Sequence, residues 1–324
     1  MPFQRRALLA TLLAVPAIAR AQAFPDRPLR MIVPFAAGTS SDIQGRLAAQ
    51  RMSERLGQTV VVENRAGGGG TVGAEVVAKA RPDGHTLLLG SNGPLTVNPV
   101  LQSRLPYNVE TELAPIALMS RSPLTVTVKA DSPLRSLADL VAAAKARPGD
   151  ITIGSSGQGS ATHFLIEQFM AQAGIRLTHV PYRGSSQSVP DLIAGNVQVV
   201  MGEISTTVPS WRGGLVRILA TTGPTRSPLA PDIATLIEQG FPGLTGGSWA
   251  ALMATGGTPA AAIAALNAAA MAALADPVYR QRQEEVGAQL SEAAVRTPEG
   301  LATWLREERA RTRATAESAG IRAE

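Results

Sequence analysis

Two loops place polar residues where α/β proteins bind small anions. The first covers residues 34–42, reads Pro-Phe-Ala-Ala-Gly-Thr-Ser-Ser-Asp, and joins a predicted strand to a predicted helix. Ligands of open α/β sheets bind at the carboxyl ends of the strands. At that end, the free N–H groups and the dipole of the following helix favour an anion. A simpler interpretation stays open, in which Ser40, Ser41 or Asp42 only caps the helix.

The second loop covers residues 154–162 and reads Gly-Ser-Ser-Gly-Gln-Gly-Ser-Ala-Thr. It also follows a predicted strand and precedes a predicted helix. Its hydroxyls beside flexible backbone form a natural nest for a carboxylate or a phosphate. It is not a nucleophile elbow, because G-x-S-x-G would need glycine where Gln158 stands. A hydrolase would need a nucleophile–base contact, for example between Ser160 and His163.

The sequence gives little support for a bound cofactor or metal ion. Residues 68–73 match G-x-G-x-x-G, but the acidic residue expected about 20 positions later in a dinucleotide-binding unit is missing. The chain has no cysteine, which excludes thiolate metal sites and disulfides, and only three histidines. We therefore expect no metal and no cofactor.

Composition argues against nucleic acid as a partner. The net charge is +5, and Arg5, Arg6 and Arg20 lie in a segment predicted to be removed, which leaves 5 − 3 = +2. Aromatic residues make up only 4% of the chain, too few for a base-stacking surface. We expect no nucleic-acid binding.

The N-terminus has the pattern of an export signal. Arg5 and Arg6 precede an apolar run, residues 7–19, that is shorter than the roughly 20 residues of a membrane-spanning helix. Ala21 and Ala23 place small residues before a cleavage site, so we predict residues 1–23 to be a cleaved signal peptide. In a bacterium the product is periplasmic. The general secretory route is expected, and the arginine pair leaves twin-arginine export open.

Apolar periodicity predicts alternating strands and helices, with buried strands that indicate a parallel sheet covered on both faces. We predict strands at residues 29–35, 59–63, 86–90, 124–128, 151–153, 178–180, 197–201, 216–220 and 248–254, and helices at 40–56, 71–80, 136–146, 161–173, 259–275, 278–287 and 298–318. The fold class is thus α/β. Two closely packed lobes are expected, with the chain crossing between them near residues 120 and 245.

Several colinear motifs resemble those of one family. They are residues 25–35 with Gly38 and Asp42, residues 57–65 with Gly73, residues 82–90, Asn98-Pro99, residues 179–185 and residues 195–199. Taken in this order behind an export signal, they are similar to the Bug proteins, the periplasmic solute receptors of tripartite tricarboxylate transporters.

The resemblance implies a two-lobed periplasmic-binding-protein fold, type II-like, with the ligand in the cleft between lobes. Residues 24–121 and 247–324 would form the first lobe and residues 122–246 the second. The expected ligand is a small organic carboxylate: a di- or tricarboxylate, an acidic amino acid or an aromatic carboxylate. The partners would be the membrane components of the transporter, and we expect a monomer that is not an enzyme. A receptor that signals, or an exported α/β hydrolase or isomerase, remains the alternative.

The resemblance also implies the binding residues. These are Phe35, Ala36, Gly38 and Asp42 in the first loop, Ser91 and Asn92 beside it, and Ser155, Gly157, Ser160, Thr162, Tyr182, Gly184, Ser185 and Glu203 in the opposite lobe.

Two departures from the family pattern bear on the ligand. Residues 36–39 read Ala-Ala-Gly-Thr where the family usually has Pro-Pro-Gly-Gly. Residues 201–203 read Met-Gly-Glu where it often has Phe-Asp-Asn. In members that bind amino acids an acid in this stretch meets the ammonium group, and Glu203 could supply that acid from the next position.

Overall fold

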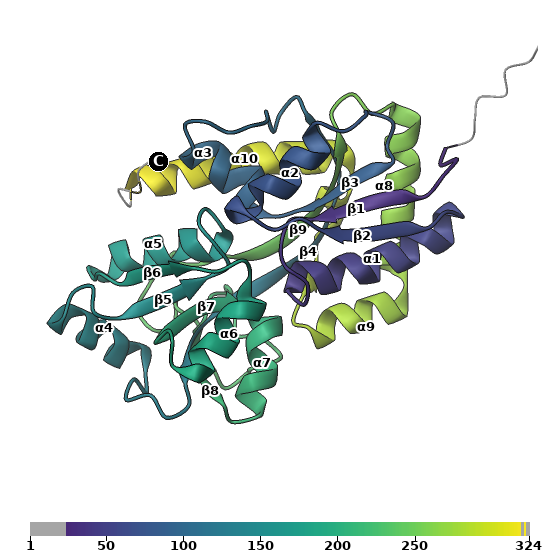
Figure 1. Ribbon diagram of the computed structural model, residues 1–324. Coiled ribbons are helices and arrows are strands. Elements are labelled where there is room, and N and C mark those ends of the chain that lie inside the picture. The colour runs from purple at the N-terminus through teal and green to yellow at the C-terminus, as the bar shows by residue number, and fades with distance from the viewer. Residues whose placement is uncertain (1–23, 319–320, 322–324) are drawn as a thin grey trace, which may run out of the picture.

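The chain forms two lobes that share one long strand. The computed structural model describes residues 24–318 and residue 321 (Figure 1). The predicted signal peptide, residues 1–23, lies outside them. Strand β4 (Leu113–Lys129) pairs antiparallel with β9 (Gly247–Thr255) along its first part, and with β7 (Val199–Glu203) and β8 (Val216–Thr221) along its second. The exchange of partners between Pro123 and Leu124 marks the hinge.

The first lobe has a mixed sheet with helices on both faces. Strands β2 (Val60–Asn64), β1 (Leu29–Val33) and β3 (Thr86–Gly90) are parallel, and β9 joins β3 antiparallel. The two-residue β10 (Gln289–Leu290) pairs with β4. The helices are α1 (Ser40–Leu56), α2 (Thr71–Ala78), α3 (Asn98–Leu101), α8 (Ala260–Ala275), α9 (Pro277–Glu285) and α10 (Pro298–Ser318), with short helices η1 (Gly68–Gly70), η2 (Gly93–Val97) and η3 (Ala293–Arg296).

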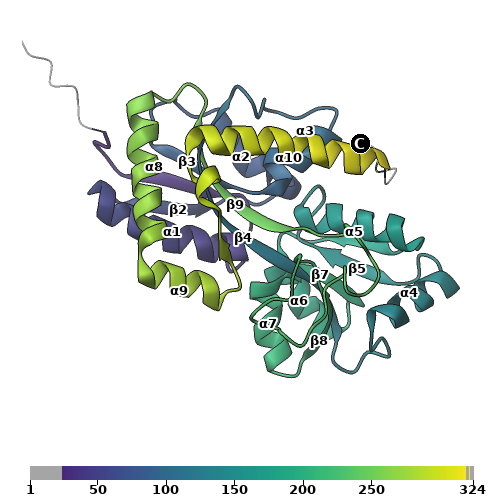
Figure 2. The same ribbon diagram turned by 180° about the vertical axis from the view of Figure 1, so that it is seen from behind.

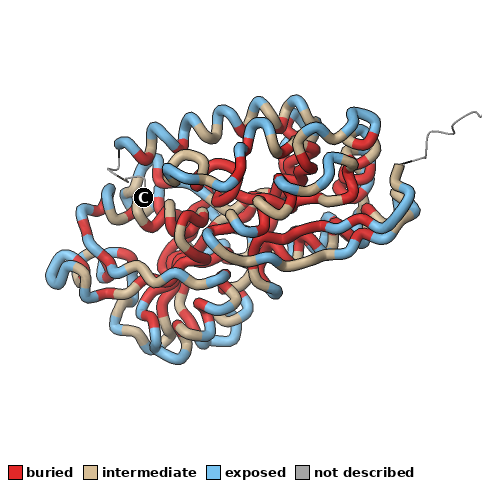
Figure 3. The backbone as a smooth tube through the Cα atoms, turned by 45° about the horizontal axis from the view of Figure 1, so that its top comes forward, coloured by how far each residue is buried: buried red, intermediate tan, exposed pale blue. Residues whose placement is uncertain are grey.

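Two apolar layers hold the first lobe together. On one face, α1 and α8 bury Met52 and Leu266 against the sheet, and on the other, α2 and α10 bury Val77 and Leu301. The buried backbone follows the strands through the centre of the molecule (Figure 3). In the described part, no single helix is long and apolar enough to cross a membrane; α8 and α9 reach that length only as a pair bent by 70°.

The second lobe repeats the arrangement on a smaller scale. Strand β5 (Thr152–Ser155) lies between the parallel strands β6 (Thr178–Pro181) and β7, and β7 continues antiparallel into β4. Helices α4 (Leu137–Ala146), α5 (Ala161–Ala173), α6 (Ser185–Ala194) and α7 (Ile204–Arg212) cover it. Phe169 of α5 and Leu140 of α4 are completely buried against this sheet.

The structure confirms the alternating elements and corrects them at the hinge. The strand predicted at residues 124–128 is only the second half of β4, which begins at Leu113. The parallel sheets are confirmed for β1, β2 and β3 and for β5, β6 and β7, but β4, β8 and β9 run antiparallel. Helices α6 and α7 were not predicted.

We expect Gly73→Ala to destabilise the fold. A Cβ atom at Gly73, on α2, would lie 2.8 Å from Cα of Pro34 and 3.0 Å from the carbonyl oxygen of Arg65. Neither backbone atom can yield easily, so the expected loss in free energy of unfolding is about 1–3 kcal/mol. Urea unfolding measures it. Gly213→Ala is the control, because its φ is −76° and its nearest neighbour would lie at 3.4 Å, so it should change stability little.

Candidate functional site in the interlobe cleft

The first loop is built around the carboxylate of Asp42. Thr39 caps α1 by accepting a hydrogen bond from the backbone N–H of Asp42. The Asp42 carboxylate accepts hydrogen bonds from the N–H of Gly38 at 3.0 Å, from Asn64 at 2.9 Å and from Arg46 at 3.1 Å. Burial of Asp42 works against its charge, but these hydrogen bonds outweigh it and keep the pKa of Asp42 below its ordinary value.

Asp42 therefore positions the loop. Asn64 also donates to the carbonyl oxygen of Phe35 at 3.0 Å, so one amide ties both ends of the loop together. Gly38 has a φ of +77°, in the left-handed region that suits glycine. The first N–H groups of α1, at Ser40 and Ser41, have no partner inside the helix and lie at the positive end of its dipole. Sequence analysis missed Asn64 as a site residue, although it quoted the motif that contains it.

The second loop is closed by its own hydroxyls. Ser160 caps α5 by accepting from the N–H of His163, and its Oγ lies 2.8 Å from Oγ1 of Thr162. Thr162 in turn accepts from the N–H of Ser156 at 2.8 Å. Ser155, Ser160 and Thr162 are buried. The loop is thus rigid before any ligand contacts it.

Two stacked histidine rings contact the second loop through Ser155. The rings of His163 and His179 lie 4.1 Å apart, and Nε2 of His179 lies 2.6 Å from Oγ of Ser155. Ser155 also accepts from the N–H of Gly157 at 3.0 Å. Burial lowers the pKa of His179 to about 4, aided by repulsion from His163 and opposed by attraction to Glu167. His179 is therefore neutral at pH 7, and its Nε2 can accept a hydrogen bond from the Ser155 hydroxyl.

Glu203 is the last residue of β7 and is 9% exposed. Its carboxylate accepts hydrogen bonds from Ser156, at 3.1 Å, and from Ser185. The two serine hydroxyls are themselves 3.0 Å apart. Ser185 is the first residue of α6, which Gly184 precedes with a φ of +153°. None of the described basic side chains forms an ion pair with Glu203. Sequence analysis did not select Ser156, which links the loop of α5 to the start of α6.

Tyr182 is placed differently from its neighbours. Its hydroxyl donates a hydrogen bond to Asp191 of α6 at 2.9 Å, and its ring packs against Gly154. Burial and the adjacent Asp191 raise the pKa of Tyr182 to about 12. The hydroxyl of Tyr182 is thus hydrogen-bonded within the second lobe.

The two lobes touch through backbone and small residues. The N–H of Ala36 donates to the carbonyl of Arg183 at 3.3 Å, and Ser186 donates to the carbonyl of Ala37. A Cβ atom on Gly184 would lie 2.5 Å from the Thr39 methyl group. These contacts bring the starts of α1 and α6 together.

A second contact joins the lobes on the other side of the site. A Cβ atom on Gly69 would overlap the carbonyl of Gln158, and one on Gly93 would lie 3.2 Å from the carbonyl of Gly159. Asn98, completely buried, donates to the carbonyl of Gly68 and to Thr71 and so fixes this turn. Ser91 is buried nearby, whereas Asn92 turns toward the hinge and accepts from the N–H of Trp249 at 3.3 Å.

The contact that a hydrolase would require is not formed between Ser160 and His163. Nδ1 of His163 accepts from the N–H of Gly159 at 3.1 Å, and the Ser160 hydroxyl accepts from the His163 backbone. Ser155 does meet His179, but Ser155 is completely buried and serves the loop. Across the described residues, no group of three His, Asp or Glu side chains could hold a metal ion.

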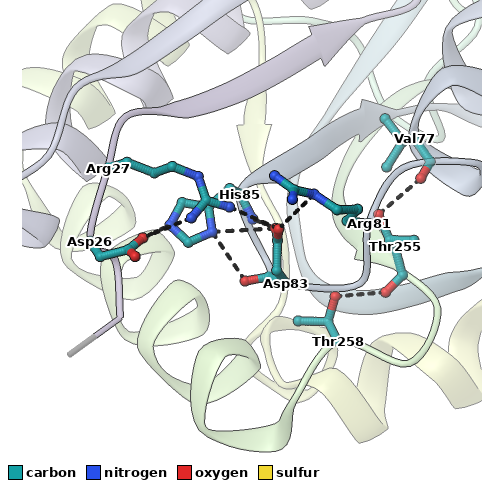
Figure 4. Close-up of polar contacts among 8 residues, drawn as sticks. All are labelled: Asp26, Arg27, Val77, Arg81, Asp83, His85, Thr255 and Thr258. Carbon is teal, nitrogen blue, oxygen red and sulfur yellow. Dashed lines mark hydrogen bonds and ion pairs between the residues drawn. The ribbon is translucent and has the colours of Figure 1, made fainter. Parts of the chain in front are cut away.

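The third histidine belongs to a structural cluster far from the cleft. His85 packs edge-on against Phe24. Its ring lies 3.0 Å from a carboxylate oxygen of Asp26 and 3.3 Å from one of Asp83 (Figure 4). Arg27 joins the cluster through Asp83 at 2.8 Å. The cluster fastens the segment before β1 to the turn before β3.

We expect Asp42→Ala to lower both stability and ligand affinity. The change leaves the Gly38 N–H and the Asn64 amide without their acceptor, which costs about 1–3 kcal/mol in free energy of unfolding. Chemical unfolding of the ligand-free protein measures it. Glu285→Ala, which removes an exposed ion pair with Arg282, is the control and should change stability much less than Asp42→Ala. Unchanged stability of Asp42→Ala would contradict the positioning role.

His179 should make the protein less stable in mild acid. Between pH 6.5 and about 4, the unfolded chain binds a proton at His179 that the folded protein does not, so the free energy of unfolding falls as the pH is lowered. We expect His179→Gln to remove about 1 kcal/mol of the loss between pH 7 and pH 5, a value reduced for partial solvent exposure. Urea unfolding at both pH values tests this. An identical loss in the variant would rule the effect out.

Known proteins share this arrangement. The family model described as the tripartite tricarboxylate transporter family receptor matches residues 45–318. BugT of Bordetella pertussis is 38% identical over 248 residues, which are 76% of each chain. Among solved structures, the periplasmic binding protein BugD has a TM-score of 0.89 at 32% identity and covers 93% of this chain and 100% of its own. MatC from Rhodopseudomonas palustris, with bound malate, has a TM-score of 0.86 at 32% identity and covers 90% of this chain and 99% of its own.

These matches extend over nearly all described elements of both lobes. The fold is that of a two-lobed periplasmic binding protein. The chain therefore belongs to the tripartite tricarboxylate transporter receptor family, the periplasmic solute-binding proteins that include the Bug proteins.

Proposed function

We propose that the protein captures a small organic carboxylate outside the cytoplasm and presents it to the membrane components of a tripartite tricarboxylate transporter. The observation that carries the proposal is the meeting of three helix N-termini, those of α1, α5 and α6, where the lobes touch. Unpaired N–H groups and helix dipoles at such a point favour an anion. The malate bound in MatC supports a carboxylate.

The capture mechanism is proposed to be closure of two bodies, residues 24–121 with 247–324 and residues 122–246. The carboxylate would bind at the start of α1, beside Phe35, Ala36 and Gly38, in the loop that Asp42 holds. The second lobe would then close through Ser160, Gly184 and Ser185 and complete the hydrogen bonds of the ligand. We propose that the receptor acts as a monomer and performs no chemistry on the ligand.

Glu203 narrows the ligand class. A buried carboxylate normally has a cationic partner, because burying an unpaired charge is costly. Glu203 has only the two serine hydroxyls among its described neighbours. Its carboxylate also lies against Ser185 at the start of α6, where a second carboxylate of a ligand would otherwise bind. We therefore favour a carboxylate that carries an ammonium group, such as an acidic amino acid, over a dicarboxylate.

A thermal-shift screen of the purified protein tests the ligand class. The panel holds malate, succinate, citrate, aspartate, glutamate and benzoate, with a free amine and a sugar as controls. A ligand at 100 times its dissociation constant adds about 2.7 kcal/mol, which should raise the midpoint by roughly 5 °C. We expect aspartate or glutamate to give the largest shift. A shift with the amine or sugar alone would contradict carboxylate capture.

Glu203→Gln separates the role of the acid from the rest of the site. We expect it to weaken binding of an amino acid at least tenfold, by removing the buried negative charge beside Ser156 and Ser185, and to leave a dicarboxylate as tight or tighter. Calorimetric titration measures both. Glu238→Gln, at an exposed acid on the same lobe, is the matched control and should keep the amino-acid affinity. Equal losses for both ligand classes would show that Glu203 does not select for an ammonium group.

A further inference from the structure

A large groove lies beside the cleft, between helices that belong to different lobes. It has a volume of about 1070 Å³, with α5 of the second lobe as one wall and α10 of the first as the other (Figure 2). Its floor is the hinge, where Arg121, Ser122 and Pro123 of β4 run beside Ser248 and Trp249 of β9. Asn92 and Ala161 line the groove next to the glycine contact between the lobes, so the groove begins where that contact ends.

The floor carries an arginine that lacks a close anionic partner. The Arg121 guanidinium lies 5.1 Å from the centre of the Trp304 ring, and its nearest acid, Glu292, is 3.9 Å away and largely exposed. Nε of Arg121 is buried and makes no hydrogen bond within the described chain. By contrast, Arg311 in the same groove is paired with Glu308. An arginine stacked on an aromatic ring keeps its planar donors ready for a carboxylate or sulfonate.

A second buried donor lies on the same face of the ladder between β4 and β9. Nε1 of Trp249 is buried and has no hydrogen-bond partner in the described part of the protein. Trp249 is 5% exposed and pairs directly with Arg121 across the ladder, so the two side chains lie on one face of the sheet, whereas Ser122, the next residue of the strand, lies on the other. Buried donors are nearly always satisfied. Two unsatisfied donors on one face, Nε of Arg121 and Nε1 of Trp249, therefore favour an acceptor-rich group at this floor.

The walls combine apolar and aromatic side chains with polar ones, among them Gln168, Glu292 and Glu308. Phe164 and Leu165 of α5 face the groove from one side, and Leu290 and Trp304 from the other. A guanidinium whose ion pair is long, 3.9 Å to Glu292, beside aromatic side chains suits a ligand with one negative charge on an aromatic body. We propose that the groove is a second ligand site, separate from the interlobe cleft, which binds an aromatic monocarboxylate or monosulfonate with its anionic group on Arg121. Because each lobe supplies one wall, the ligand would also hold the lobes at a fixed angle.

Titration of the full-length purified protein with the aromatic sulfonate 8-anilinonaphthalene-1-sulfonate tests this site. Trp249 and Trp304 adjoin the site and allow energy transfer from tryptophan to the dye as the readout. We expect one binding site per chain and at least a tenfold weaker affinity in Arg121→Gln. Arg306→Gln, on α10 but outside the groove lining, is the matched control and should bind the dye as the native protein does.

A steric variant keeps the test independent of Arg121. Gln168→Phe narrows the groove from α5 without adding a tryptophan and should weaken dye binding, while Ser185→Ala, in the interlobe site, should leave it unchanged. All variants are compared only after urea unfolding shows native stability. Native dye affinity in both Arg121→Gln and Gln168→Phe would overturn the proposal. Loss of dye binding in Ser185→Ala would also overturn it, because the dye would then occupy the cleft.

Discussion

The architecture depends on the hydrogen bonds of a single strand. β4 gives its first half to the sheet of one lobe and its second half to the sheet of the other, and β9 returns beside it. Each sheet therefore contains one half of β4, while the other half of the same strand is hydrogen-bonded in the sheet of the other lobe. The strand β4 exchanges its partners between Pro123 and Leu124, beside the start of β9 at Gly247.

The cleft is assembled from weak elements that reinforce each other. No residue of the first loop binds an anion strongly alone, but Asp42 and Asn64 hold the loop so that the start of α1 faces the second lobe. In that lobe, hydroxyls link Ser160, Thr162, Ser156, Ser185 and Glu203 into one chain of hydrogen bonds. Such a network fixes positions before a ligand arrives, which lowers the entropy that binding must offset.

Much of the fold follows from apolar spacing and stop signals. The range 40–56 was predicted for α1 because apolar residues recur at helical spacing and Gly57 ends the helix, and the structure agrees. The strand at residues 86–90 and the helix at 298–318 also agree. The start of β4 escaped prediction because Pro115 and two register shifts break its pattern. α6 and α7 escaped it because each contains a proline, Pro190 and Pro209.

The two loops of the site could be predicted from the sequence, but the contacts between their side chains could not. Glycine and hydroxyl residues after strands identify Gly38 and Ser160 as candidates. Their sequence does not say that Ser156 reaches Glu203, 47 positions away, or that Tyr182 turns its hydroxyl to Asp191. These pairings arise from the packing of β5, β6 and β7, which brings distant positions together. The division into lobes at residues 121 and 246, and the roles of the binding residues, stay predictions.

The contact between Gly69, Gly93 and the loop at Gly157–Gly159 has an evolutionary consequence. It joins the lobes through main chain, and side chains larger than hydrogen at these points would collide with it. The way in which the lobes meet therefore does not depend on which side chains face the ligand. Mutation can exchange a carboxylate such as Glu203 while the lobes still meet in the same way. Proteins with this fold can therefore change their ligand specificity while they keep the same contact between the lobes.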